Sequence, residues 1–282
     1  AIVAIVIWTQ GKKFINLKYW KYGLAFSLPL IPEALSIQIM NQSDKIMIQK
    51  MISNEAAGIF ALATTISFII WILEDSVWNA WIPWLYAKIS QGEEKEVAKP
   101  WTSVMHMFGI FSWVIVMLAP EAIAILGPAK YRPAVWLIAP MVSGTLFRFY
   151  SYSYSALQNY YKRTQYVAAG TIGTMVLNVI LNYVCILNFG YMAAAYTTAF
   201  SYIILLLVQG ILEHKITGMV IVPLRKTLLI AVVYGAINLL SMNLYETAWY
   251  FRYAVLILVV VAAAIALRKQ MAAVLKMFKK RK

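Results

Sequence analysis

The chain is a series of long apolar runs separated by short polar segments. A helix of about 20 apolar residues crosses the hydrocarbon core of a bilayer. On this pattern eight spans are predicted, at 22–40, 58–86, 104–118, 134–157, 167–187, 192–212, 227–244 and 253–267. Because the connections between them are short, neighbouring helices are expected to pack antiparallel.

The composition supports a membrane interpretation of these runs. Of the 282 residues, 62% are hydrophobic and 13% are charged, whereas a soluble domain has about 25% charged residues. The predicted fold class is therefore all-α, a polytopic bundle of transmembrane helices. The apolar stretch 1–8 is too short to span a bilayer, so it is predicted to be the end of a truncated transmembrane helix.

The distribution of basic residues predicts the orientation of the spans. The net charge is +14, and Lys and Arg accumulate in the cytoplasmic loops of membrane proteins. Most of the basic residues fall in alternate connections, at 12–21, 88–99, 162–163, 215–226 and in the tail 268–282. We therefore expect a cytoplasmic basic tail, and the charge requires no nucleic-acid partner.

Residues for catalysis or cofactor binding are not grouped in this sequence. The two histidines, His106 and His214, lie far apart without Cys, Asp or Glu at ligand spacing, and Cys185 is alone in an apolar run. We expect no metal site, no cofactor and no enzymatic activity.

Four charged residues lie within predicted spans, where a charge costs about 2.5–3.5 kcal/mol and usually faces water or the bundle interior. They are Glu33, Glu74, Asp75 and Arg148. Arg148 is too far from either end of its span to reach a surface. It can form a buried ion pair with Glu74 or Asp75, or it can contact an anionic head group, and the two roles are compatible.

The first span contains Pro29 and Pro32, which remove backbone donors and bend or break a helix. Backbone freed at this depth is tolerated where it is buried in protein or lines a cavity. A broken helix that carries Glu33 on a cavity wall is one interpretation, and a static kink is the other.

Four segments carry a family resemblance: they read LPLIPEALSIQIMNQSDKIMI (28–48), GIFALATTISFII from Gly58, NAWIPWLYAKI from Asn79 and LAPEAIAILGPAKYRPAVWLIAPMVSG from Leu118. In this order they resemble the C-terminal half of polysaccharide and O-antigen flippases. These form the Wzx-type branch of the MATE-like multidrug/oligosaccharidyl-lipid/polysaccharide exporter superfamily.

The resemblance implies two lobes of six helices that face each other across a central cavity. Residues 22–212 are expected to form the C-terminal six-helix lobe, and 227–267 an additional helix pair. The segment departs from the family pattern at Glu33, where a His is common, and at Lys45, where an Arg is common. Asp44 and Lys45 join the intramembrane ions as candidate cavity residues.

By resemblance the protein is a flippase that moves a polyprenyl-pyrophosphate-linked oligosaccharide from the inner to the outer leaflet. The oligosaccharide is a repeat unit of O-antigen, and thus of lipopolysaccharide, or of capsule or exopolysaccharide. The implied location is the bacterial plasma (inner) membrane. Membrane lipids and other polysaccharide-assembly proteins are the implied partners.

Two alternatives remain from the residues themselves. A cation-coupled drug antiporter of the same superfamily would use Glu33, Glu74 or Asp75 as ion sites. A membrane polysaccharide polymerase or ligase would need a sizeable outward loop to hold its acceptor. The longest predicted outward loop, 120–133, is short for that role.

Overall fold

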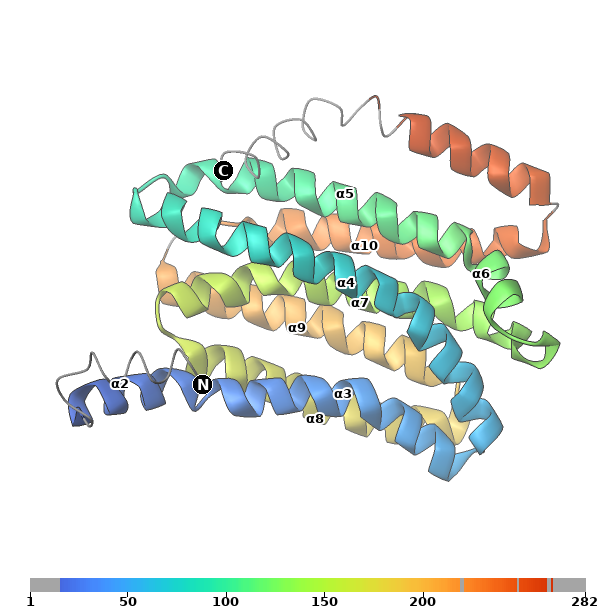
Figure 1. Cartoon of the computed structure of the whole chain (residues 1–282), viewed down its shortest axis with the longest axis horizontal. Coiled ribbons are helices and arrows are strands. Elements are labelled where there is room, and N and C mark those ends of the chain that lie inside the picture. Colours follow the sequence, from blue (N-terminus) through green and yellow to red (C-terminus); the bar gives the residue numbers. More distant parts are fainter. Residues whose placement is uncertain (1–15, 219–220, 248, 263–264, 266–282) are drawn as a thin grey trace, which may run out of the picture.

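The computed structural model describes residues 16–218, 221–247, 249–262 and 265, and throughout these residues regular structure is helical. The fold class predicted from the sequence, a bundle of helices, is confirmed (Figure 1). The predicted truncated helix at 1–8 and the basic tail at 268–282 lie outside the described residues. Residues 263, 264, 266 and 267 of the last predicted span also lie outside them.

Most helices match the predicted spans to within a few residues at each end and extend slightly beyond them. The first span is the exception: it was predicted to end at residue 40, and the helix continues to Met51. In chain order they are α2 (Leu17–Ser27), α3 (Leu30–Met51), α4 (Asn54–Ser90), α5 (Ala98–Met117), α6 (Ala119–Leu126), α7 (Val135–Tyr160), α8 (Thr164–Phe189), α9 (Ala193–Thr217) and α10 (Leu224–Ser241). Shorter 3-10 segments are η1 (Glu94–Glu96), η2 (Ala129–Ala134) and η3 (Met242–Glu246), and an apolar helix follows at Trp249–Ala262. The extensions arise because helical hydrogen bonding continues after the apolar pattern ends.

Six helical segments within the described residues are long and apolar enough to cross a membrane: Leu17–Met51, Asn54–Ser90, Glu94–Met117, Thr164–Phe189, Ala193–Thr217 and Leu224–Glu246. The chain is therefore a multi-pass membrane protein. The helix α7 is not among them, although the sequence predicts a span at 134–157. Serines and Arg148 lower its hydropathy, and most of its residues are buried by other helices rather than exposed to lipid.

The helix α7 lies at the centre of the bundle. It packs most extensively against α9 and α4, and also contacts α10 and α5. The helix α3 packs along α8, on the opposite side of the bundle from α5 and α10 (Figure 1). From their shared corner at Ile52 and Ser53, α3 and α4 diverge in Figure 1, and the cavities described below lie along these two helices.

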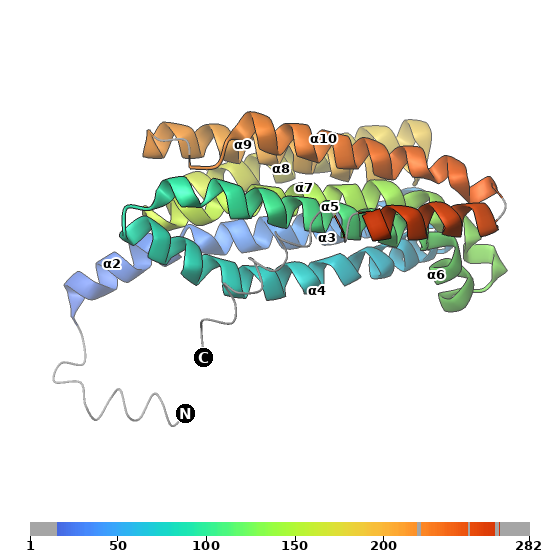
Figure 2. The same ribbon diagram turned by 90° about the horizontal axis from the view of Figure 1, so that it is seen from above.

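The predicted interruption of the first span is confirmed. The helix α2 ends at Ser27, and α3 begins at Leu30 with Pro29 at its N-cap. A proline has no N–H for the bond that would continue α2. Figure 2 shows α2 reaching beyond the end of the bundle, and none of its residues is buried.

The predicted outward loop 120–133 is folded rather than irregular. It forms α6 and η2, with Pro120 in the first turn of α6, where a proline costs no hydrogen bond. Glu121 of α6 forms an ion pair with Arg252, which lies in the helix Trp249–Ala262. The helix α10, the first helix of the predicted extra pair, packs directly on α5 and α7.

Candidate functional site

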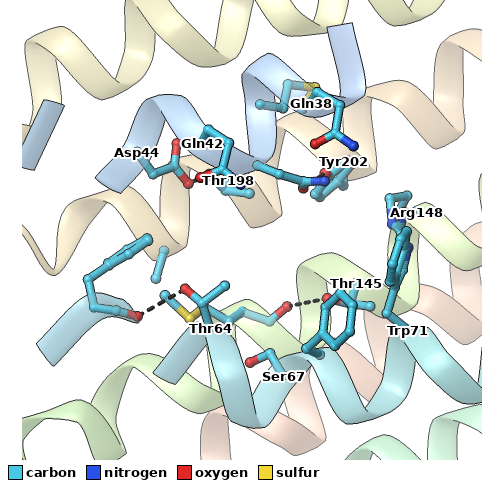
Figure 3. A pocket seen from close by; sticks show the side chains of 16 residues that line it. Gln38, Gln42, Asp44, Thr64, Ser67, Trp71, Thr145, Arg148, Thr198 and Tyr202 are labelled. Atoms are coloured by element: carbon cyan, nitrogen blue, oxygen red, sulfur yellow. Dashed lines mark hydrogen bonds between the residues drawn. The ribbon is translucent and has the colours of Figure 1, made fainter. Parts of the chain in front are cut away.

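A cavity of about 290 Å³ lies between α3, α4, α7 and α9. We call it the amide cavity because amide and hydroxyl side chains form most of its polar lining: Gln38, Asn41, Gln42, Thr64, Ser67, Thr145, Thr198 and Tyr202. Aromatic rings of Phe60, Phe68 and Trp71 also line it. The charged residues in its wall are Asp44 and Arg148, which lie well apart in Figure 3.

Arg148, from the centre of α7, forms a buried ion pair with Glu74 of α4. The distance from Arg148 Nη2 to Glu74 Oε2 is 2.7 Å, and both side chains are almost fully buried. The guanidinium carbon lies 5.6 Å from the ring centroids of Trp71 and Tyr152, which suits cation–π attraction. Across the part of the chain that the structure describes, Arg148 Nη1 and Glu74 Oε1 have no hydrogen-bond partner.

A second cavity, of about 280 Å³, lies on the other side of this ion pair. We call it the acidic cavity because Glu33, Glu74 and Asp75 line it, together with Trp71, Trp78, Asn79, Ile82, Tyr86, Tyr152, Ser155, Ala156 and Asn159. Trp71 lines both cavities, while Arg148 lines the first and Glu74 the second. The ion pair and the Trp71 ring therefore stand between two cavities that extend toward opposite ends of the bundle.

The structure brings together most of the residues singled out from the sequence. Glu33, Glu74 and Asp75 meet at the acidic cavity, and Asp44 shares the amide cavity with Arg148. Glu33 thus lines a cavity just after the helix break, as one of the two sequence interpretations expected. Lys45 is the exception, because its side chain is exposed and lines neither cavity.

Of the two acidic partners left open for Arg148, the structure selects Glu74. Asp75 is exposed and accepts a hydrogen bond from Asn79 Nδ2 at 3.3 Å. Adjacent residues on a helix point about 100° apart, so only one of the two carboxylates can face α7. The sequence does not fix the rotation of α4 and could not make this choice.

Sequence reasoning missed the polar partners of Asp44. They are Thr198 of α9 and Asn182 of α8, and Asn178 lies one turn before Asn182. Two asparagines four residues apart within an apolar span are a readable signal, because both lie on the same face of the helix. Trp71 and Tyr202 were also missed, since aromatic residues are frequent throughout this chain.

Among the described residues there is no group of three or more His, Cys, Asp or Glu side chains that could hold a metal ion. Chemically, the two cavities offer hydrogen bonding through amides and hydroxyls, aromatic surface, the buried ion pair of Arg148 and Glu74, and the further carboxylates of Asp44, Glu33 and Asp75.

Comparison with known proteins gives one family match. Residues 1–90 match a family model described as "Polysaccharide biosynthesis protein". Over the first third of the chain, this match agrees with the resemblance to a polysaccharide-biosynthesis family that the sequence segments indicate. The helices α3 and α4 fall inside the matched residues together with Glu33, Asp44 and Glu74, and Arg148 lies outside them. Neither a curated protein nor a solved structure shows significant similarity to the chain.

Proposed function

The chain is similar over residues 1–90 to polysaccharide biosynthesis proteins, and from this premise we propose that it is part of a lipid-linked oligosaccharide flippase. The protein moves a polyprenyl-pyrophosphate-linked repeat unit of O-antigen, capsule or exopolysaccharide from the inner to the outer leaflet. It works as a transporter and not as an enzyme. Its chain corresponds to the C-terminal lobe of the two-lobe exporter architecture.

The observation that carries this proposal is the pair of cavities on either side of Arg148. Sugar hydroxyls are recognised by amide and hydroxyl groups and by aromatic faces, and the amide cavity has all three. Arg148 supplies a cation beside the cavity, and a guanidinium matches phosphate oxygens in a bidentate geometry. The polyprenyl tail needs no protein cavity, because it remains in the lipid.

Alternating access is the transport mechanism that fits this arrangement. In such transporters the binding site lies near the bilayer midplane, and rocking of one repeat against the other opens it to each side in turn. Arg148 lies at mid-bundle between two cavities that extend toward opposite ends. A substrate diphosphate that attracts Arg148 would weaken its pairing with Glu74 and so alter the barrier between the cavities.

We further propose that the protein lies in the bacterial inner membrane with its C-terminus in the cytoplasm. The bias of basic residues toward alternate connections supports this orientation. In this orientation the corner at Ile52 and Ser53 faces the outside of the cell, and the acidic cavity extends toward the cytoplasm. Its partners are the lipid-linked oligosaccharide, membrane lipids and other proteins of polysaccharide assembly.

Export of glycan by cells that carry variants of the full protein tests the role of Arg148. We expect Arg148→Ala to abolish export while the protein still inserts in the membrane. Arg148→Lys should retain part of the activity, because it keeps the charge and loses the planar fork. Normal glycan export by the alanine variant would contradict the proposal.

The matched control removes Glu74 at the same time. In Arg148→Ala with Glu74→Ala no carboxylate is left without its counter-ion, so a purely structural role of Arg148 predicts restored export. A direct contact with the diphosphate predicts a double variant that is inserted and folded but inactive. We expect the second result.

The acidic cavity favours one alternative function, a cation-coupled drug antiporter. Three carboxylates beside aromatic rings suit an organic cation better than a diphosphate. Reconstituted vesicles separate the two functions: an antiporter exchanges a fluorescent cationic drug for protons or sodium, whereas a flippase moves a lipid-linked oligosaccharide to the other leaflet.

A further inference from the structure

Trp71 of α4 differs from the tryptophans of the core because it borders open space. The residue is 39% exposed, and it lines both the amide cavity and the acidic cavity. Trp113, in contrast, is 5% exposed and donates its indole N–H to Ser241 Oγ at 2.8 Å. A structural role of that kind does not account for a large aromatic ring at the junction of two cavities.

The ring of Trp71 is held next to Arg148. The guanidinium carbon lies 5.6 Å from the ring centroid, and Figure 3 shows the two side chains at the same end of the amide cavity. The Phe68 ring, about one turn earlier on α4, contacts Trp71 with the ring centroids 4.7 Å apart. These two contacts fix the position of the indole, while part of its surface faces the cavity.

The polar groups at this end of the cavity come from two other helices. Figure 3 places Gln38 of α3 and Thr145 of α7 on the side of the cavity where Arg148 lies, and Asp44 on the opposite side. The Thr145 hydroxyl donates to Met141 O at 3.1 Å, so its oxygen can still accept a hydrogen bond. The amide of Gln38, an exposed residue, can both donate and accept.

A sugar that is joined to a diphosphate presents surfaces that match these groups. A pyranose ring has apolar C–H groups on its faces and hydroxyl groups around its edge, so it stacks on an aromatic ring and forms hydrogen bonds at its edge. When Arg148 binds the diphosphate, the sugar bonded to that diphosphate lies close to the guanidinium. The aromatic surface beside this position is the Trp71 ring, and Gln38 and Thr145 are the hydrogen-bonding groups.

We propose that Trp71 is a specificity-determining residue, which stacks on the first sugar of the substrate, the one bonded directly to the diphosphate. This role rests on the function proposed above and adds the residue that distinguishes a carrier loaded with sugar from the bare polyprenyl diphosphate. Both carriers offer a diphosphate to Arg148, but only the loaded one gains the contact with the indole. The contact therefore favours binding of the loaded carrier.

The experiment measures the binding of two probes to the purified full protein in detergent by isothermal titration calorimetry. One probe is farnesyl diphosphate, and the other is the same compound with N-acetylglucosamine joined to the diphosphate. We expect the protein to bind the sugar-bearing probe more tightly. Trp71→Ala should reduce this preference about five- to tenfold, because it removes the stacking contact.

Two further substitutions at the same position separate the aromatic face from the volume of the side chain. Trp71→Tyr should retain part of the preference, because an aromatic face remains. Trp71→Leu fills much of the space without such a face and should lose the preference as Trp71→Ala does. Arg148→Ala should weaken the binding of both probes by a similar factor, because both carry the diphosphate.

The matched control is Trp84→Ala. Trp84 is a half-buried tryptophan of the same helix that packs on the ring of Trp81 and lines neither cavity, so its loss should leave the preference unchanged. The role of Trp71 is overturned if Trp71→Ala weakens both probes equally, which would mean that the ring serves only Arg148, or if the preference is unchanged. Equal affinity of the unmodified protein for both probes would overturn it and leave the flippase proposal standing, whereas binding of neither probe would contradict both.

Discussion

At the scale of single residues, the pairing of Arg148 with Glu74 dominates the interior. Two opposite charges are removed from water together, and the attraction between them offsets their desolvation only while both are present. The contacts with Trp71 and Tyr152 add to the stabilisation of the cation. The pair is therefore sensitive to the loss of either partner.

We predict that Arg148→Ala destabilises the folded bundle by about 3–5 kcal/mol, because it leaves Glu74 buried without a counter-ion. Arg148→Ala combined with Glu74→Ala should be less destabilising than the single change. Thermal unfolding of the four members of the double-mutant cycle in detergent measures the coupling between them. Additivity within about 0.5 kcal/mol would show that the two residues do not interact.

Asp75 supplies the control for this cycle. It neighbours Glu74 in sequence and is exposed, so Asp75→Ala should change stability by less than about 0.5 kcal/mol. Its effect should also add to that of Arg148→Ala. Strong coupling between Arg148 and Asp75 would mean that α4 is rotated from the orientation found here.

At the scale of helices, the contact between α7 and α9 depends on a small residue. A Cβ atom added at Gly144 of α7 would lie 3.1 Å from the Cα atom of Ala199 in α9. Backbone cannot move aside as a flexible side chain can. Small residues allow transmembrane helices to approach closely, and here they set the distance between the central helix and its main neighbour.

We predict that Gly144→Ala destabilises the protein by about 1–3 kcal/mol, because the extra methyl group overpacks the α7–α9 contact. Gly144→Leu should be worse. The measurement is the unfolding midpoint of each purified variant in the same detergent. An unchanged midpoint for Gly144→Leu would contradict the close contact.

Gly173 of α8 is the matched control for this substitution. It also lies inside a helix, but an added Cβ atom meets nothing within 4 Å. Gly173→Ala should leave stability unchanged or raise it by up to about 1 kcal/mol, because alanine restricts the unfolded chain. The two glycines are indistinguishable by local sequence, and only their neighbours separate them.

At the scale of the whole molecule, the alternation of helices defines two ends. Figure 1 shows the connection between α4 and α5 and the turn between α7 and α8 at one end, and α6 and η3 at the other. Exposed charged residues mark each end, Lys95 and Lys162 at the first and Lys130 and Glu246 at the second. The bias of basic residues assigns the first end to the cytoplasm.

We predict that single cysteines at Lys130 and Glu246 react with a membrane-impermeant maleimide in intact cells, whereas cysteines at Lys95 and Lys162 react only after the cells are opened. The native Cys185 is replaced by Ser in every variant so that one thiol is measured at a time. Labelling at Lys95 from outside intact cells would reverse the orientation and place the acidic cavity on the outer side.

Much of this architecture follows from the sequence because a bilayer imposes a simple rule: backbone polar groups in hydrocarbon must bond within their own segment. Apolar runs of sufficient length therefore become helices, and their boundaries were predicted to within a few residues at 58–86 and 167–187. The break at Pro29 was also predicted from the sequence, because proline lacks the N–H that would continue the helix. The helix α6 was not predicted, because a segment of eight residues needs contacts with its neighbours to be stable as a helix.

The sequence by itself determined that the chain is a bundle of membrane helices and which of its residues carry charges that are costly inside the membrane. It also determined that Arg148 needs a partner or a ligand within the bundle. Only the tertiary structure decided that the partner is Glu74, that Lys45 lies outside the cavities, and that Asp44 meets Asn182 and Thr198. The physical reason is rotation: hydropathy fixes the length and position of a helix along the chain. The direction in which each side chain points is fixed by contacts between residues that are far apart in sequence.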